Sequence, residues 1–181
     1  MSGNAAPGRA KAASVGKESR AARERASRAS KVPLAPVQWA AVPLPGGGWR
    51  LVVPGRPVSS NQSGGGREHW AERKRRLDGY VTALTYLRLQ HGLRDVPVLI
   101  RAMLRMTCYF PTRKVRDPHN YGPGAGGKAL VDALTLGTDR APRSGWVTDD
   151  APEFLGVDGE PELAFGALRT EIVLEPWEGE R

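Results

Sequence analysis

The 181-residue sequence is poor in the features that mark disulfide-bonded, secreted and membrane-spanning proteins. It has a single cysteine, Cys108, so no internal disulfide can form, as is typical of proteins in a reducing compartment. It contains no apolar run of about 18 residues, and its N-terminal stretch has no continuous apolar core. The sequence therefore predicts a soluble, cytoplasmic protein with no membrane contact. Because Cys108 lies inside an apolar run, a core position is favoured over a nucleophile.

Residues 1–31 lack aromatic side chains altogether. They carry eight Lys/Arg and two Glu, and almost no large aliphatic residue. Such a segment cannot bury enough apolar surface to offset the entropy of ordering it, so we predict a disordered basic tail. Residues 32–47 are rich in Pro and Gly and predict a linker with room for one short strand. Residues 48–181 are then the folded domain, which is long enough to bury one core.

Acidic residues are scarce everywhere except near the C-terminus. The net charge is +6 in residues 1–31, +10 in residues 32–148 and −8 in residues 149–181. A basic body and tail favour a polyanionic partner, of which nucleic acid is the commonest. The alternative is a solvated tail that only keeps the protein soluble.

Apolar periodicity predicts the main elements. Residues 48–55 predict a strand ended by Pro54–Gly55, and residues 56–66 a flexible loop. The spacing of apolar residues in 67–90 predicts an amphipathic helix with an apolar face of Trp70, Leu77, Tyr80, Val81, Leu84 and Leu87. Its opposite face carries Arg73, Lys74, Arg75 and Arg76, which either contact DNA or form a solvated surface.

Two alternating segments predict strands with one buried face. Residues 98–110 place Ile100, Ala102, Leu104, Met106, Cys108 and Phe110 on one side, and residues 167–176 alternate likewise at Leu168, Thr170, Ile172 and Leu174. Residues 127–134 predict a short helix, and residues 143–153 a turn that carries two acids. These elements predict a compact α+β domain, with a small mixed β-sheet and helices packed on one face.

The stretch HNYGPGAGGKALVDAL (119–134) has the glycine and lysine spacing of a phosphate-binding P-loop. Position 129 is alanine, however, whereas that motif needs a Ser or Thr hydroxyl to hold Mg²⁺. The preceding residues are charged and include Pro118, which is unsuited to the buried strand that a P-loop follows. We therefore expect no nucleotide cofactor.

Acidic residues and a lysine from separate elements converge in the predicted sheet. Asp117 follows a strand, Lys128 begins a helix, and Asp149 and Asp150 follow the next turn. Clustered carboxylates are the ligands that Mg²⁺ prefers, and a lysine beside such a site can offset the charge of a phosphodiester. The alternative is that the two acids decorate a turn while Asp132 pairs with Lys128 on the helix surface.

The ordered set of short motifs resembles the RusA-type Holliday junction resolvases, which are small phage and bacterial endonucleases. RDPHN (116–120), Lys128, DAL (132–134) and DD (149–150) are similar to that family's core signature. RPVSSNQ (56–62) is similar to its early Pro/Ser/Asn segment, and a basic helix and a strand ending in basic residues follow as in the family. The resemblance covers about residues 48–176.

The resemblance implies metal-dependent hydrolysis of phosphodiesters in four-way DNA junctions, in recombination and repair, by a homodimer in a bacterial or phage-infected cell. Asp117, His119, Asp149 and Asp150 take the positions of metal ligands for Mg²⁺, with Mn²⁺ as the alternative, and a bound water attacks. The catalytic set is Asp117, His119, Lys128 and Asp150, with Asn120 and Asp132 as further candidates. Arg113, Lys114 and Arg116 join the basic helix as DNA contacts. The rival interpretation is a DNA-binding protein that has lost catalysis.

The sequence departs from the family pattern at two places. His119 stands where the family usually has a second metal-binding aspartate, and YGPGAGG lengthens the gap between Asn120 and Lys128. Imidazole in place of a carboxylate weakens a site for a hard cation and relatively favours Mn²⁺. Alternatively, His119 acts as a base toward water or phosphate, because its ordinary pKa lies near neutrality.

Overall fold

The computed structural model describes residues 35–63 and 70–178, and the compact unit within them begins at Pro36. The predicted basic tail, residues 1–31, lies outside the described residues. Strand β1 (Ala40–Pro43) falls inside the segment predicted as a linker and pairs with β2 (Trp49–Pro54). That part of the segment therefore belongs to the sheet.

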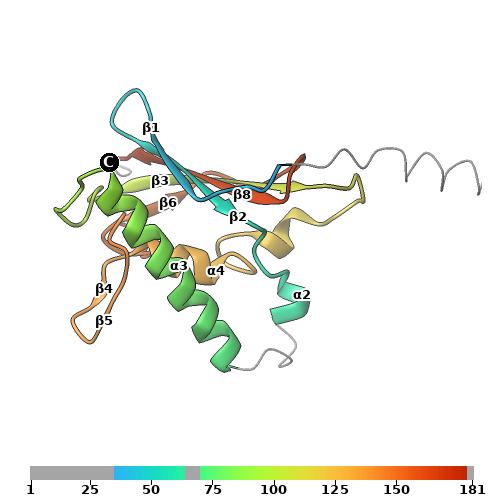
Figure 1. Ribbon diagram of the computed structural model, residues 1–181, viewed down its shortest axis with the longest axis horizontal. Coiled ribbons are helices and arrows are strands. Elements are labelled where there is room, and N and C mark those ends of the chain that lie inside the picture. Colours follow the sequence, from blue (N-terminus) through green and yellow to red (C-terminus); the bar gives the residue numbers. More distant parts are fainter. Residues whose placement is uncertain (1–34, 64–69, 179–181) are drawn as a thin grey trace, which may run out of the picture. The chain divides into compact units, whose positions relative to one another are not determined.

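One mixed sheet organises the domain (Figure 1). Its strand order is β1-β2-β8-β3-β6, and β7 also pairs with β3. The pairs β1–β2, β2–β8 and β8–β3 are antiparallel, whereas β6 and β7 run parallel to β3. The remaining bounds are β3 (Ala102–Phe110), β6 (Leu155–Val157), β7 (Glu162–Phe165) and β8 (Arg169–Pro176). The predicted α+β class with a mixed sheet is confirmed.

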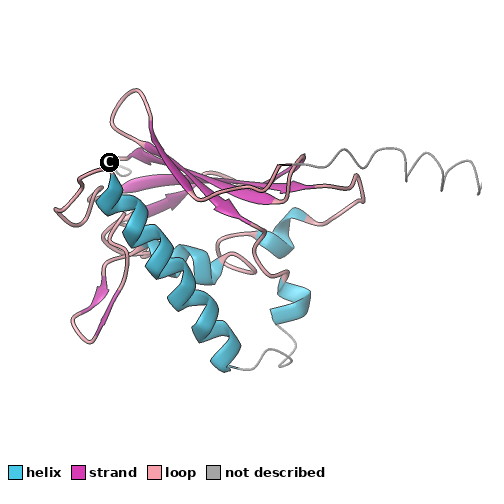
Figure 2. Ribbon diagram, viewed as in Figure 1, coloured by secondary structure: helices cyan, strands magenta, loops and turns pink. Residues whose placement is uncertain are grey.

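Helices α3 (Trp70–Gln90) and α4 (Lys128–Leu134) lie on one face of this sheet (Figure 2). The core between helices and sheet includes Leu84 of α3, Leu130 of α4 and Leu104 of β3, all at most 1% exposed. Two short helices, α2 (Ser60–Ser63) and η1 (Pro118–Tyr121), and a small hairpin of β4 (Gly137–Thr138) and β5 (Ala141–Pro142) complete the described elements.

The alternation predicted for the two long strands is confirmed along their centres. The even-numbered residues of β3 from Ala102 to Phe110 are buried, and so are Thr170, Ile172 and Leu174 of β8. The predictions for Ile100 and Leu168 are wrong, since these side chains are 70% and 42% exposed. Both residues precede the first paired residue of their strand, where the sheet and the helices no longer cover them.

The opposite face of the sheet carries ion pairs instead of helices. Arg105 of β3 lies 2.8 Å from Glu175 of β8, and Arg169 lies 2.7 Å from Glu171. Alternate residues of a strand point to opposite faces, so the same alternation that builds the core leaves this face polar. None of the helices in the described part of the chain is long and apolar enough to cross a membrane.

Three local predictions need correction or comment. Trp70 was predicted on the apolar face of the helix, but it begins α3 and is 71% exposed, because the first turn extends beyond the edge of the core. The predicted loop 56–66 contains the single helical turn α2. Cys108 is fully buried, as predicted, and burial raises the pKa of its thiol to about 11, so it stays protonated at neutral pH.

Candidate phosphate-binding site

Lys128 is the centre of a charged cluster at the start of α4. Its Nζ atom donates hydrogen bonds to Asp132 Oδ1, at 2.6 Å, and to Asp150 Oδ2, at 2.5 Å. Asp132 lies one helical turn further along α4, and its other carboxylate oxygen is 3.9 Å from Arg73 Nη2 of α3. We call these four residues, Arg73, Lys128, Asp132 and Asp150, the Lys128 cluster. It unites two helices with a turn that is distant in sequence.

Contacts within the cluster favour the charged forms of Lys128 and Asp150. Partial burial favours the neutral form of Lys128, but hydrogen bonds and attraction from Asp132 and Asp150 outweigh it and raise the pKa of the ammonium above its usual value. The hydrogen bond from Lys128 lowers the pKa of the Asp150 carboxyl group. Lys128 is therefore a permanent cation and Asp150 a permanent anion over the physiological range.

The buried side chain of Trp146 anchors the segment that carries Asp150 to Lys128. The indole is fully buried and donates through Nε1 to the backbone carbonyl of Leu84 in α3, at 3.1 Å. The backbone N–H groups of Trp146 and Val147 both donate to the carbonyl of Leu134, the last residue of α4. Val147 also forms a bridge with Leu99 just before β3. This anchoring places the turn that follows, with its two acids, beside α4.

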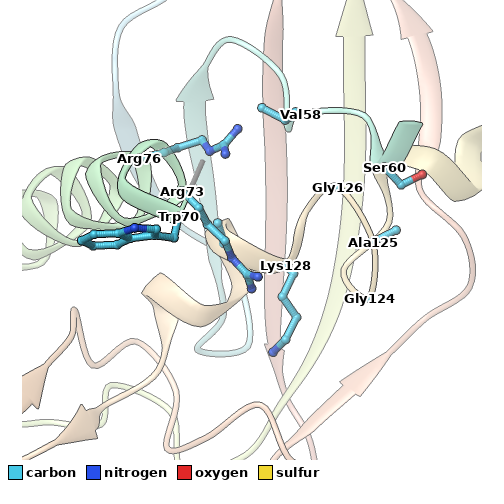
Figure 3. A pocket seen from close by; sticks show the side chains of 10 residues that line it. Val58, Ser60, Trp70, Arg73, Arg76, Gly124, Ala125, Gly126 and Lys128 are labelled. Carbon is cyan, nitrogen blue, oxygen red and sulfur yellow. The ribbon is translucent and has the colours of Figure 1, made fainter. Parts of the chain in front are cut away.

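A hollow of about 600 Å³ opens next to the cluster and is lined by cationic side chains (Figure 3). Arg73 points toward Lys128 across it, and the glycine loop that precedes α4 forms the other side. Its lining residues are Val58, Ser60, Trp70, Arg73, Arg76, Gly124, Ala125, Gly126, Lys128 and Ala129. Three of them are Lys or Arg and none is acidic, but Asp132 and Asp150, which are not among the lining residues, pair with Lys128, and Asp132 also faces Arg73.

The glycines before Lys128 allow close packing of the backbone. A Cβ atom on Gly126 would lie 1.9 Å from the carbonyl oxygen of Val58 and 2.5 Å from that of Asn120. A Cβ atom on Gly127 would lie 2.9 Å from the carbonyl oxygens of Tyr121 and Gly122. The loop thus packs against both the segment before α2 and η1, which places Lys128 at the edge of the hollow. This role differs from the cradling of a nucleotide triphosphate.

The structure places Asp117 and His119 in a different local setting from Lys128. Asp117 is the N-cap of η1, where its Oδ1 atom accepts a hydrogen bond from the backbone N–H of His119 at 3.1 Å. The imidazole Nδ1 of His119 lies 3.8 Å from Glu160 Oε1, and both side chains are well exposed. His119 and Glu160 line a second hollow, of about 220 Å³, on which the loop residues Gly124 and Ala125 also border. The loop therefore separates the two hollows.

Asn120 connects the two segments that resemble the resolvase family. Its Oδ1 atom accepts a hydrogen bond from the hydroxyl of Ser60 at 2.5 Å, so the RPVSSNQ stretch contacts the RDPHN stretch. Within the described residues, no hydrogen bond or ion pair joins Asn120, Asp117 or His119 to the Lys128 cluster. Asp117, His119 and Asn120 therefore make the contacts described above around η1, whereas Asp132 and Asp150 contact Lys128.

Among the residues that the structure describes, the carboxylates are not grouped into a metal centre. Asp149 accepts a hydrogen bond from the backbone N–H of Ala151 at 3.2 Å and faces solvent beside Asp150. Among the described residues, no three or more His, Cys, Asp or Glu side chains are grouped so that they could hold a metal ion. The predicted ligand set of Asp117, His119, Asp149 and Asp150 for Mg²⁺ or Mn²⁺ therefore stays a prediction.

The predicted DNA-contacting cations also divide into two groups. Arg73 and Arg76 line the large hollow, whereas Lys74 pairs with Asp78 at 2.7 Å and Arg75 is exposed on α3. Arg113, Lys114 and Arg116 follow the C-terminal end of β3. There they line a third hollow of about 270 Å³. The guanidinium of Arg116 lies 4.0 Å from the ring centroid of Phe110.

Four residues of these settings were not predicted from the sequence: Ser60, Arg143, Glu160 and Phe165. Arg143 donates to the carbonyl of Asp132 at 2.8 Å and so braces the C-terminal part of α4. Arg143 and Glu160 carry no motif that could have revealed them. Ser60 could have been found, because it lies inside a segment already recognised as similar to the resolvase family.

Comparison of the sequence with models of protein families and with curated proteins gave no match. The assignment of function therefore depends on the geometry of the site and on the ordered motifs.

Proposed function

We propose that this chain is a metal-dependent endonuclease of the RusA type that cleaves branched DNA, with the four-way junction as its substrate. The observation that carries the proposal is the Lys128 cluster beside a cationic hollow. Lys128, Asp132 and Asp150 come from three of the family-like motifs, and both carboxylates contact Lys128. Under this proposal the fold is also that of the family, and two symmetric cuts require a homodimer.

Lys128 is the residue that would hold the scissile phosphate. An ammonium has three N–H donors, and Asp132 and Asp150 accept two of them in the structure. The third donor can bind a phosphate oxygen at the edge of the hollow, where Arg73 adds a second positive charge. Two carboxylates hold the Lys128 ammonium in place before the negative charge of the transition state develops. A preorganised cation of this kind stabilises the transition state most.

The requirement for a divalent cation comes from the resemblance, with Asp117 and Asp150 as its ligands. If bound, the cation would polarise the phosphodiester and activate water. Because the described side chains do not group into a metal centre, we derive no step of the reaction through it. The chain's own contribution is to bind the phosphate at Lys128 and to hold Asp150 ionised next to it.

A DNA-binding protein without catalysis is the second candidate. The observation in its favour is that the acids nearest Lys128 are already neutralised by the ammonium and by Arg73. A cluster whose charges are matched in this way can serve as a structural brace between α3, α4 and the turn at Asp150. In that case the cationic lining of the hollow would bind DNA and nothing would be cleaved.

Cleavage of a synthetic four-way junction, in Mg²⁺, in Mn²⁺ and in EDTA, distinguishes the two candidates. The proposal predicts cleavage that needs a divalent cation and that Asp117→Asn and Asp150→Asn abolish, while both variants still bind the junction. Asp139→Asn is the matched control, because Asp139 lies in the exposed turn between β4 and β5, and it should cleave normally. Binding without cleavage in either metal would favour the non-catalytic candidate.

A further inference from the structure

Phe165 is an exposed aromatic ring at the edge of the sheet, surrounded by cations. It ends β7 and is 53% exposed, while its neighbour in register on β3, Phe110, is 3% exposed. Strands β3 and β7 are parallel, so the segments that follow them leave the sheet at the same end. The residues that follow β3 are Pro111–Arg116, which include three of the predicted DNA-contacting cations.

Two of these cations, Arg113 and Arg116, lie over aromatic rings. The guanidinium of Arg113 lies 5.0 Å from the centroid of Phe165, and that of Arg116 lies 4.0 Å from the centroid of Phe110. Both distances are within the range of about 6 Å over which a cation is attracted to a ring face. We call Phe110, Arg113, Lys114, Arg116 and Phe165 the Phe165 surface; all of them line the hollow of about 270 Å³.

Hydrogen bonds hold the loop of this surface in shape. Arg116 donates to the carbonyl oxygens of Thr112 and Lys114, at 3.0 and 2.8 Å, and to the hydroxyl of Thr112 at 2.7 Å. These bonds close the loop around the guanidinium that covers Phe110. Arg116 therefore shapes the loop, while Arg113 and Lys114 remain exposed on its outside.

The charge of the Phe165 surface is uncompensated. Within residues 35–63 and 70–178, no carboxylate lies within ion-pair distance of Arg113, Lys114 or Arg116. This differs from Arg169 close by, which pairs with Glu171 at 2.7 Å. Three cations around an exposed ring combine attraction for a phosphate backbone with a flat apolar face, which is how proteins bind single-stranded nucleic acid.

We propose that the Phe165 surface binds an unpaired DNA base, which stacks on Phe165 while Arg113 and Lys114 contact the adjoining phosphates. This inference rests on the proposed function, because it takes DNA as the partner. The hollow is smaller than the sites of about 300 to 1,000 Å³ that enclose whole small molecules, so one planar base suits it. Such a contact would let the protein distinguish strands with unstacked bases, as at a branch point, from continuous duplex.

Binding of a short oligothymidine strand and of a blunt duplex, both in EDTA so that nothing is cleaved, tests the inference. Phe165→Ala should weaken binding of the single strand by about 5- to 150-fold, which is about 1 to 3 kcal/mol for one stacked base. Its binding of the duplex should change less than about twofold. Phe165→Trp should keep the preference, and Tyr86→Ala, which removes an exposed ring from α3, should change neither affinity.

Two outcomes would overturn the inference: equal losses on the two DNAs, or no loss on either. An oligoglutamate peptide that displaces oligothymidine from the wild type but binds Phe165→Ala poorly would overturn it as well, in favour of an acidic peptide as the occupant. The selective loss at Phe165 supports the inference even if the junction is never cleaved. If the protein cleaves junctions but Phe165→Ala does not change the binding of oligothymidine, the inference is wrong and the proposed function is unaffected.

Discussion

Two cationic regions of the molecule differ in the groups that their cations contact. In the Lys128 cluster, Lys128 and Arg73 lie against the carboxylates of Asp132 and Asp150. On the Phe165 surface, Arg113 and Arg116 lie against aromatic rings. The first arrangement cancels charge and fixes geometry, whereas the second leaves the positive charge in place. The two regions should therefore contribute differently to DNA binding, although both look equally basic in the sequence.

This difference assigns separate tasks to the two regions. Paired cations release few counterions when DNA arrives, because their charge is already neutralised, so they add little salt-dependent affinity. Unpaired cations attract the phosphate backbone and position the DNA without reading its sequence. We infer that the Phe165 surface supplies much of the affinity and the Lys128 cluster the chemistry. The variants below can break or sharpen this division.

The largest effect that separates the two regions is expected at Lys128, smaller only than the loss of cleavage proposed for Asp117→Asn and Asp150→Asn. Lys128→Met should lower the single-turnover rate of junction cleavage by about 10²- to 10³-fold, the usual cost of removing one preorganised donor to a charged transition state. Junction affinity should fall far less. Lys128→Arg should recover part of the rate, since it keeps the positive charge.

Arg140→Met is the control for Lys128→Met, because Arg140 is an exposed cation in the turn between β4 and β5. It should cleave at the wild-type rate. If Lys128→Met instead lowers affinity and leaves the cleavage rate unchanged, the Lys128 cluster is a binding region and the division of tasks is wrong.

His119→Asp restores the acid that the resolvase family usually has at this position. A third carboxylate adds a charged oxygen donor, so we expect the apparent Mg²⁺ affinity to rise up to about tenfold, with a shift of preference away from Mn²⁺. Metal titrations of junction cleavage at matched pH measure it. Because His119 lies beside Glu160 across the glycine loop, lower Mg²⁺ affinity or lost activity would give the imidazole a role of its own.

Arg113→Ala and Arg73→Ala compare the two regions directly. Loss of one phosphate contact on duplex DNA lowers the slope of log affinity against log salt by about 0.9. We expect that full change for Arg113→Ala, and a clearly smaller one for Arg73→Ala, whose charge already faces Asp132. Salt titrations of duplex binding in EDTA give both slopes. Equal changes in slope would show that pairing with Asp132 does not reduce the role of Arg73.

Periodicity predicted β2, β3 and β8 because burial in a strand follows the alternation of side chains, but it did not indicate β6 and β7. The buried faces of β3 and β8, and the extents of β2 and α4, follow from apolar residues at regular spacing. The prediction failed at or just before the first residue of an element, where the opposite layer does not cover the chain, as at Trp70, Ile100 and Leu168. Periodicity identifies a face but cannot show where the opposite layer ends.

The candidate site was predictable only in part, because its residues come together through long-range packing. The i,i+4 pair of Lys128 and Asp132 follows from helix geometry, and the structure confirms it. The approach of Asp150 depends on Trp146 binding the carbonyl of Leu84, which no local pattern indicates. Likewise, Phe165 meets Arg113 only because β7 runs parallel to β3. The sequence alone could not show which basic residues have acidic partners.

The smallest expected effect is on the free energy of unfolding. The pH dependence of this effect should differ between the Lys128 cluster and the Phe165 surface. The folded-state pKa of Asp150 is lowered, so its contribution is present above the ordinary carboxyl pKa of about 3.9 and is lost as the pH falls through the lower folded value. The folded-state pKa of Lys128 is raised, so its contribution is complete below about 10.4 and is lost only at higher pH. Between about pH 5 and pH 9 the ion pair is therefore intact.

Asp150→Asn should lower the free energy of unfolding by about 0.2 to 1 kcal/mol in that window, because the side chains of Lys128 and Asp150 are 43% and 33% exposed and solvent screens the pair. The difference from the wild type should shrink below about pH 4, where the Asp150 carboxyl group of the unfolded chain begins to be protonated while that of the folded protein stays ionised. Arg116→Ala on the Phe165 surface should instead show a cost that does not depend on pH, since Arg116 contacts a phenyl ring, a hydroxyl and backbone carbonyls rather than a carboxylate. Urea unfolding of both variants from acidic to neutral pH measures the two profiles. A pH-independent cost for Asp150→Asn would mean that the carboxylate charge contributes nothing, and that only the shape of the side chain holds the turn against α4.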